Sequence, residues 1–310
     1  MNPESGRTGV YVKLALVATI WGSTFIAGRI VSAEMSAPVA AFGRFLIATL
    51  TLLLLVLVLE HGLPRLTLRQ WLSFTLQGAI GVAAYALCFM YGLQSVSASR
   101  GSLIMALVPA ATLLGGALFL HEPLTRQRVL GVALALVGVA VELGDGNPLK
   151  LFTAPIGYGE VALFGCVLAW SAYTLLGKRI MGDGISPLAA TTCAAITGTA
   201  ILFIACVIMG DLGAPNATWK GWLSLAFMGV LGTAIAYYWF FDGVKVIGPA
   251  RSAVFVNLVP VVAITLGVLL LGERLDVSML AGAALVVSGV WIINRAPAVL
   301  PAPVPAHTAQ

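Results

Sequence analysis

The chain has 310 residues, of which 60% are hydrophobic and only 9% are charged, and its formal net charge is +5. A soluble domain of this length could not bury so much apolar surface, so the composition excludes an ordinary water-soluble fold and indicates a protein whose solvent is lipid. The positive balance does not indicate a nucleic-acid partner, because the basic residues lie between apolar segments and form no stripe with interleaved aromatics.

In chain order, the apolar runs predict ten transmembrane helices. Each run has about 18–24 residues, enough to cross ~30 Å of hydrocarbon, and short turns containing Gly, Pro and Asp separate them. The proline-rich residues 295–310 predict a disordered tail. The sequence therefore predicts an all-α polytopic membrane protein, with spans at 11–31, 37–59, 71–93, 98–120, 126–143, 156–177, 186–209, 219–242, 248–271 and 277–294.

The most informative pattern is an internal repeat, because the segment 92–143 matches the segment 243–294 at a constant offset. Each half of the chain holds five apolar runs, and an odd number inverts the second half across the bilayer, as in many transporters. We therefore expect two inverted five-helix repeats, at 11–143 and 156–294. The paired positions include Arg100 and Arg251, Pro109 and Pro260, and Glu122 and Glu273.

The distribution of Lys and Arg sets the expected orientation. More of these residues fall on the side of the N-terminus, so both termini are expected in the cytoplasm. The four cysteines fall within apolar runs and lack metal-ligand spacing, and such cysteines behave as small hydrophobic residues. We expect no metal, no cofactor and no disulfide.

Several short motifs resemble a known family. Four motifs carry the resemblance: WGSTF at 21–25, PVAAFGR at 38–44, LHEPL at 120–124 and LGERL at 271–275. A predicted Gly-x6-Gly helix follows each of the last two. Across nearly its whole length the chain resembles the EamA branch of the drug/metabolite transporter superfamily, and within that branch it is most similar to aromatic amino-acid exporters. The resemblance implies a bacterial inner-membrane exporter of small metabolites. It also implies a basket of ten helices whose cavity is lined mainly by helices 1, 3, 4, 6, 8 and 9.

Aromatic and amide residues inside the apolar runs are the candidate ligands of a substrate. Aromatic rings such as Trp21 and Tyr85 offer an apolar face with a polar atom, and amides such as Gln77 are costly against lipid, so they should face the interior. The alternative for an aromatic residue is the interfacial belt, which we expect for Trp71, Trp219, Trp222 and Trp291. The candidate substrate-binding residues are Trp21, Gln77, Gly81, Tyr85, Met105, Trp170, Tyr173, Thr233, Tyr237 and Asn257.

Pro109 and Pro260 occupy equivalent positions in the middle of two predicted helices. Each removes one helical hydrogen bond and leaves the carbonyl of Met105 or Val256 without its usual donor. They are candidate hinges for alternating access, and a static kink is an equally good interpretation. The glycines spaced seven apart predict close helix packing instead of ligand contact. These are Gly131 and Gly138, repeated as Gly282 and Gly289.

Arg44 is a cation inside a predicted helix. It could bind a substrate carboxylate, reach the outer headgroups, or bond to helix-end carbonyls or Glu34. The structural readings are favoured, because Cys193 stands at the matching position of the second repeat. Glu122 and Glu273 each precede a predicted helix, which favours a capping role.

No acid or histidine falls in the middle of an apolar run, and Glu160 is the deepest candidate. Proton coupling through a central acid is therefore not expected, and no catalytic motif indicates an enzyme. We expect a facilitative exporter of neutral amino acids, aromatic ones included, with the lipid bilayer as its surroundings and no nucleic-acid or obligate protein partner. The alternative is proton-coupled efflux of lipophilic cations, which would favour a central carboxylate.

Overall fold

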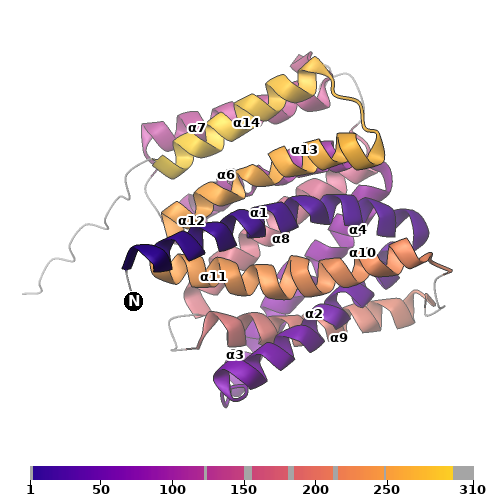
Figure 1. Ribbon diagram of the computed structural model, residues 1–310, viewed down its shortest axis with the longest axis vertical. Coiled ribbons are helices and arrows are strands. Elements are labelled where there is room, and N and C mark those ends of the chain that lie inside the picture. The colour runs from indigo at the N-terminus through magenta and orange to yellow at the C-terminus, as the bar shows by residue number, and fades with distance from the viewer. Residues whose placement is uncertain are drawn as a thin grey trace, which may run out of the picture.

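The computed structural model describes residues 3–121, 124–149, 156–180, 185–211, 216–247 and 249–295, and every regular element within them is a helix (Figure 1). Two short segments, η1 and η4, are π-helical. The elements are α1 (Pro3–Glu34), α2 (Ala37–Glu60), α3 (Leu68–Gln77), η1 (Gly78–Ala84), α4 (Tyr85–Ser95), α5 (Ala98–Met105), α6 (Val108–Leu120), α7 (Arg126–Leu143), α8 (Tyr158–Ile180), α9 (Pro187–Ile208), α10 (Trp219–Gly229), η4 (Val230–Ile235), α11 (Ala236–Ile247), α12 (Pro249–Val256), α13 (Leu258–Leu271) and α14 (Val277–Arg295).

Within the described residues, nine helical stretches are long and apolar enough to cross a membrane. Four of them are continuous runs of two or three elements: α3 with η1 and α4, α5 with α6, α10 with η4 and α11, and α12 with α13. Helix α7 has 18 residues but includes Arg126, Arg128 and Glu142, so its composition is less suited to hydrocarbon. The tenth span therefore stays a prediction.

Local sequence explains where many helices begin and end. Several begin after a Ser or Thr whose hydroxyl accepts a hydrogen bond from the N–H three residues later. A glycine in the left-handed region, Gly272 with φ of 66°, ends α13. Arg295, predicted to open the disordered tail, is instead the last residue of α14, and the rest of that tail lies outside the described residues. The capping residues are Thr67, Ser97, Thr125, Ser186 and Thr218.

Two long stretches break just before a proline. The α5–α6 stretch is interrupted at Ala106 and Leu107, ahead of Pro109, and the α12–α13 stretch is interrupted at Asn257, ahead of Pro260. Proline has no N–H and its ring crowds the preceding turn, so both breaks follow from sequence. Because the breaks fall near the middle of apolar stretches, they expose backbone groups inside the fold.

Helices α7 and α14 lie side by side at one edge of the helix bundle, and α2, α3 and α9 form the opposite edge (Figure 1). A Cβ added to Gly131 would lie 2.6 Å from the Gly289 carbonyl oxygen, and one added to Gly138 would lie 2.7 Å from that of Gly282. Only glycine permits such close backbones. The prediction that these glycines serve helix packing is confirmed.

Candidate functional site

A cavity opens between the two broken stretches and the helices that face them. Its empty volume is about 880 Å³, including the open mouth, and it is lined by α1, α2, α4, α5, α6, α8, α11, α12, α13, α14 and η4. The lining includes α2 and α14, which the family resemblance did not indicate. Helix α14 contributes a row of valines to the wall, which also includes aliphatic residues from the broken stretches. The α14 valines are Val286, Val287 and Val290.

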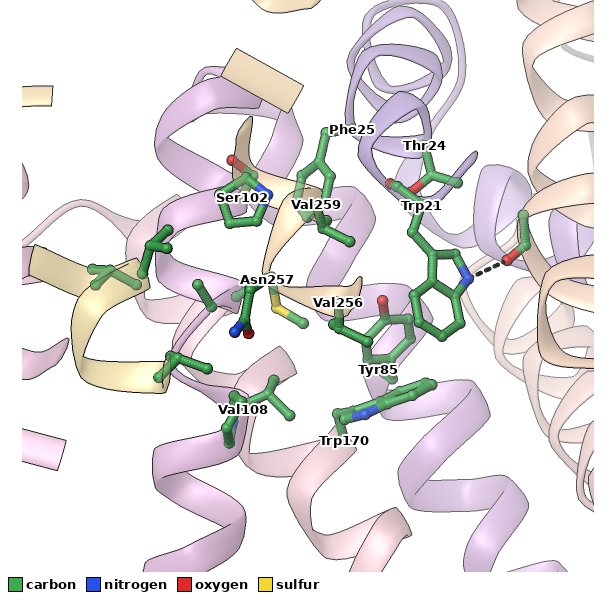
Figure 2. A pocket seen from close by; sticks show the side chains of 18 of the residues that line it. Trp21, Thr24, Phe25, Tyr85, Ser102, Val108, Trp170, Val256, Asn257 and Val259 are labelled. Atoms are coloured by element: carbon green, nitrogen blue, oxygen red, sulfur yellow. Dashed lines mark hydrogen bonds between the residues drawn. The ribbon is translucent and has the colours of Figure 1, made fainter. Parts of the chain in front are cut away.

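Figure 2 shows Trp21, Tyr85 and Trp170 on one side of the cavity, and Tyr237 also lines the cavity. The ring centroid of Trp170 lies 5.3 Å from that of Tyr85 and 5.6 Å from that of Tyr237, and Trp21 lies 5.9 Å from Tyr237. The indole nitrogen of Trp21 donates to the Gly232 carbonyl at 3.1 Å, which fixes the ring in place. Such a cluster can hold a planar apolar group without rearrangement.

The broken helices provide the polar part of the opposite side. Met105 and Pro109 line the cavity from the α5–α6 break, and Val256, Asn257 and Pro260 line it from the α12–α13 break. Figure 2 shows the Asn257 side chain directed into the cavity. A proline cannot donate to the carbonyl four residues back, so the Met105 and Val256 carbonyls lack that helical donor. Such groups can bind a cationic donor at the centre of a membrane protein.

Arg44 also lines the cavity, and only 4% of it is exposed. Its Nε and Nη2 atoms each lie 3.4 Å from the Thr233 hydroxyl oxygen, and its Nη1 atom has no hydrogen-bond partner. Its burial excludes contact with headgroups. Glu34 is not its partner, because that carboxylate accepts hydrogen bonds from the Thr218 backbone N–H and hydroxyl, each at 2.8 Å. The readings that placed Arg44 at the membrane surface or beside Glu34 are therefore wrong.

Eight of the twelve predicted binding and hinge residues line the cavity, and four do not. Tyr173 packs against Gly81, where a Cβ would collide with the tyrosine ring. Gln77 and Thr233 are 4% and 2% exposed and lie outside the lining. The spacing of four that grouped Gln77, Gly81 and Tyr85 assumed a regular α-helix, whereas η1 adds a residue to each turn. Substrate contact stays a prediction for all of them. The eight are Trp21, Tyr85, Met105, Pro109, Trp170, Tyr237, Asn257 and Pro260.

Sequence reasoning missed some of the lining. Thr24 and Phe25 lie within one helical turn of Trp21, so their helix face was available as a signal. Ser102, which is 1% exposed, is a small polar residue one turn before Met105. No local signal pointed to the α14 valines, because they resemble any lipid-facing residue.

The described acids lie outside the lining of this cavity, although Glu60 and Asp242 line a second pocket that shares Tyr237 with it. Among the described residues, no Asp or Glu lines it. Glu142 is more buried than Glu160, with side-chain exposures of 4% and 18%, whereas the greater depth of Glu160 in the membrane stays a prediction. Both belong to a network around Arg100, at 3.3 Å and 3.6 Å. A separate ion pair, Lys13 with Asp242 at 2.8 Å, joins α1 to α11.

Glu273 caps a helix, but a different one from the helix expected. Its carboxylate accepts from the Ala98 N–H at 2.7 Å, the Ser99 N–H at 3.0 Å and the Ser99 hydroxyl at 2.5 Å, so it caps α5 and not α14. The contact spans more than half of the chain and could not be read from neighbouring residues. Its repeat partner, Glu122, lies outside the described residues.

Comparisons with known proteins agree with this architecture. The chain is 29% identical to the uncharacterized transporter YyaM of Bacillus subtilis, over 91% of this chain and 92% of the relative. It is 28% identical to a probable terminal-alkyne amino-acid exporter of Streptantibioticus cattleyicolor, over 91% and 92%. It is 29% identical to the uncharacterized inner membrane transporter YedA of Escherichia coli, over 83% and 81%.

A solved crystal structure has the same fold, with a TM-score of 0.66, 19% identity and coverage of 93% of this chain and 97% of that one. The model of the EamA-like transporter family matches two ranges, 9–143 and 157–295. The long apolar helices and these matches together identify a multi-pass membrane transporter, and the chain belongs to the EamA-like transporter family.

Proposed function

We propose that this transporter exports neutral amino acids, aromatic ones included, across the bacterial inner membrane. The observation that carries the proposal is the cavity itself: it joins an aromatic cluster to backbone carbonyls and an amide at two helix breaks, and no described acid lines it. A neutral amino acid presents matching chemistry, an apolar side chain beside an ammonium and a carboxylate. The relative from Streptantibioticus cattleyicolor, described as a probable terminal-alkyne amino-acid exporter, supports the same substrate class.

The proposed architecture is ten spans in two inverted five-helix repeats, with both termini in the cytoplasm. Three features support the repeat. The proline-linked breaks fall at Pro109 and Pro260, π-helical turns interrupt two corresponding stretches, and the family model matches each half separately. Two similar halves that meet at a central cavity can open it alternately to each side. In this scheme the α5–α6 and α12–α13 breaks are the hinges.

Transport is proposed to be facilitative, down a gradient or by exchange. A proton-coupled carrier of lipophilic cations needs a titratable carboxylate that proton and cargo can both reach. The described acids are instead at helix ends, in ion pairs or capping interactions such as those of Glu142 and Glu273. The arrangement therefore favours amino-acid export over cation efflux.

The test is uptake into proteoliposomes that contain the purified protein, with a panel of radiolabelled amino acids and one lipophilic cation. We expect saturable uptake of phenylalanine, tryptophan, methionine or threonine whether or not a pH gradient is applied. Uptake of the cation alone, driven by a proton gradient, would contradict the proposal. Protein-free liposomes measure the passive leak.

A further inference from the structure

Among the arginines whose side chains the structure describes, Arg44 is the one that lines the cavity, and its hydrogen-bonding capacity is not fully used. Arg29, on α1, donates hydrogen bonds from its Nη1 atom to the Leu93 and Gln94 carbonyl oxygens, at 2.6 and 2.8 Å. Arg100, on α5, pairs with carboxylates. No ion pair among the described residues includes Arg44, and its Nη1 atom has no hydrogen-bond partner.

This guanidinium carries an uncompensated charge, because arginine stays protonated inside proteins. A buried charge without a counter-ion is costly, and buried charges are normally paired. Among the described residues its side-chain partners are neutral: the Thr233 hydroxyl oxygen at 3.4 Å, which is long for an N–H···O bond, and the Tyr85 hydroxyl, and neither supplies a counter-charge. The missing partner is therefore expected to be an anion that the cavity receives.

The Arg44 guanidinium is also held in position. Its central carbon lies 5.3 Å from the ring centroids of Phe45 and Phe89, within the range of a cation–π contact. Thr233 donates its hydroxyl proton to the Met228 carbonyl at 3.0 Å, which leaves the hydroxyl oxygen to accept from Arg44. Because the two rings and the Thr233 hydroxyl fix the guanidinium and its Nη1 atom has no hydrogen-bond partner, the group is preorganised to bind one more ligand.

We propose that Arg44 binds the carboxylate of the transported molecule. A guanidinium presents two parallel N–H groups that match the two oxygens of a carboxylate. The inference rests on the proposed amino-acid export and deepens it, because it requires the cargo to have a free carboxylate. The apolar group of the cargo then contacts the aromatic cluster of Trp21, Tyr85, Trp170 and Tyr237. A cation without a carboxylate is repelled by Arg44. The contact with the Thr233 hydroxyl positions the Arg44 guanidinium.

A competition experiment tests this with three ligands that share one ring. Phenylalanine carries both charges, 3-phenylpropanoate lacks the ammonium, and 2-phenylethylamine lacks the carboxylate. Equilibrium binding of radiolabelled phenylalanine to the purified protein is competed with each. We expect phenylpropanoate to compete and phenylethylamine to be weaker by ~10–100-fold, the range for loss of a hydrogen bond to a charged group. Equal competition by phenylethylamine in the unmodified protein would overturn the inference without any variant.

Variants then locate the effect. In Arg44→Gln we expect phenylalanine affinity to fall ~10–100-fold, to the level of phenylethylamine, and in Arg44→Lys we expect a partial loss, because the charge stays but the fork is gone. Arg65→Gln, at an exposed arginine in the loop before α3, is the matched control. Thr233→Val removes the positioning contact and keeps the charge, so discrimination against phenylethylamine should weaken but persist.

The outcomes separate the inference from the proposed function. Unchanged phenylalanine binding in a folded Arg44→Gln protein would overturn the role of Arg44 and leave amino-acid export standing. Binding of phenylpropanoate but of no amino acid, lost in Arg44→Gln, would support the carboxylate site and overturn amino-acid export. Tighter binding of phenylethylamine than of phenylalanine to the unmodified protein, unchanged in Arg44→Gln, would overturn both.

Discussion

Removal of the Glu273 carboxylate is expected to destabilise the protein, because this one side chain joins α13 to the start of α5. Ala98 and Ser99 are both fully buried, and their N–H groups end on Glu273 at 2.7 and 3.0 Å. Each buried donor left without a partner costs ~1–3 kcal/mol. Glu273→Ala leaves both donors without a partner, so we expect a loss of ~2–6 kcal/mol. Glu273→Gln keeps one acceptor, so we expect a loss of ~1–3 kcal/mol.

The assay is thermal unfolding of the purified protein in detergent, followed by a thiol-reactive dye or by intrinsic fluorescence. At about 2 °C per kcal/mol, Glu273→Ala should lower the Tm by roughly 4–12 °C and Glu273→Gln by about half of that. Asp276→Asn is the control, since it removes a nearby negative charge from an exposed residue at which Asn caps as well as Asp. Gly267→Ala places a Cβ 2.6 Å from a Glu273 carboxylate oxygen and should give an intermediate loss. Equal Tm values for Glu273→Ala and the unmodified protein would refute the capping argument.

Three further predictions concern the cavity, the glycine contact and the hinges. Trp170→Ala should weaken phenylalanine binding ~10-fold, because it removes the ring that contacts both Tyr85 and Tyr237. Trp222→Ala, at an exposed residue, should leave the affinity unchanged. Equal phenylalanine affinities of Trp170→Ala and the unmodified protein in a binding assay would contradict the prediction. Gly138→Leu should abolish the yield of folded, monodisperse protein, since even a Cβ would lie 2.7 Å from an α14 carbonyl oxygen. Gly9→Ala should be tolerated, because a Cβ there meets no atom within 4 Å. Size-exclusion chromatography measures the yield of both variants. Pro260→Ala restores a helical donor and should slow transport several-fold with little change in binding; a loss of binding with an unchanged maximal rate would favour a static kink.

Much of the helical framework could be predicted from the sequence, because hydrocarbon imposes a minimum length on each span and polar turns mark its ends. The predicted start at 98 and end at 120 coincide with α5 and α6. The first predicted helix began too late, at 11, since α1 already starts at Pro3. Polar residues there are compatible with a helix that extends beyond the apolar run, and hydrophobicity alone does not detect them.

The aromatic part of the cavity was predictable for a different reason. Trp21, Trp170 and Tyr237 are amphipathic side chains within apolar runs, and such residues gain little from contact with lipid tails. The predictions for Arg44 and Glu273 depended instead on contacts between distant parts of the chain. Arg44 meets Thr233 across 189 positions, and Glu273 meets Ala98 across 175. Neighbouring residues carry no information about such pairs, so only the fold reveals them.

The most direct test of the account is entrance counterflow in proteoliposomes, at equal pH on both sides and with no membrane potential. Vesicles loaded with unlabelled phenylalanine are diluted into a trace of radiolabelled phenylalanine. The account holds that the transporter exchanges neutral amino acids through an aromatic-lined cavity with no described acid in its lining. It therefore predicts that loaded vesicles accumulate the label transiently and that empty vesicles do not. Accumulation that requires an imposed proton gradient, or that occurs with a lipophilic cation and not with phenylalanine, would contradict it.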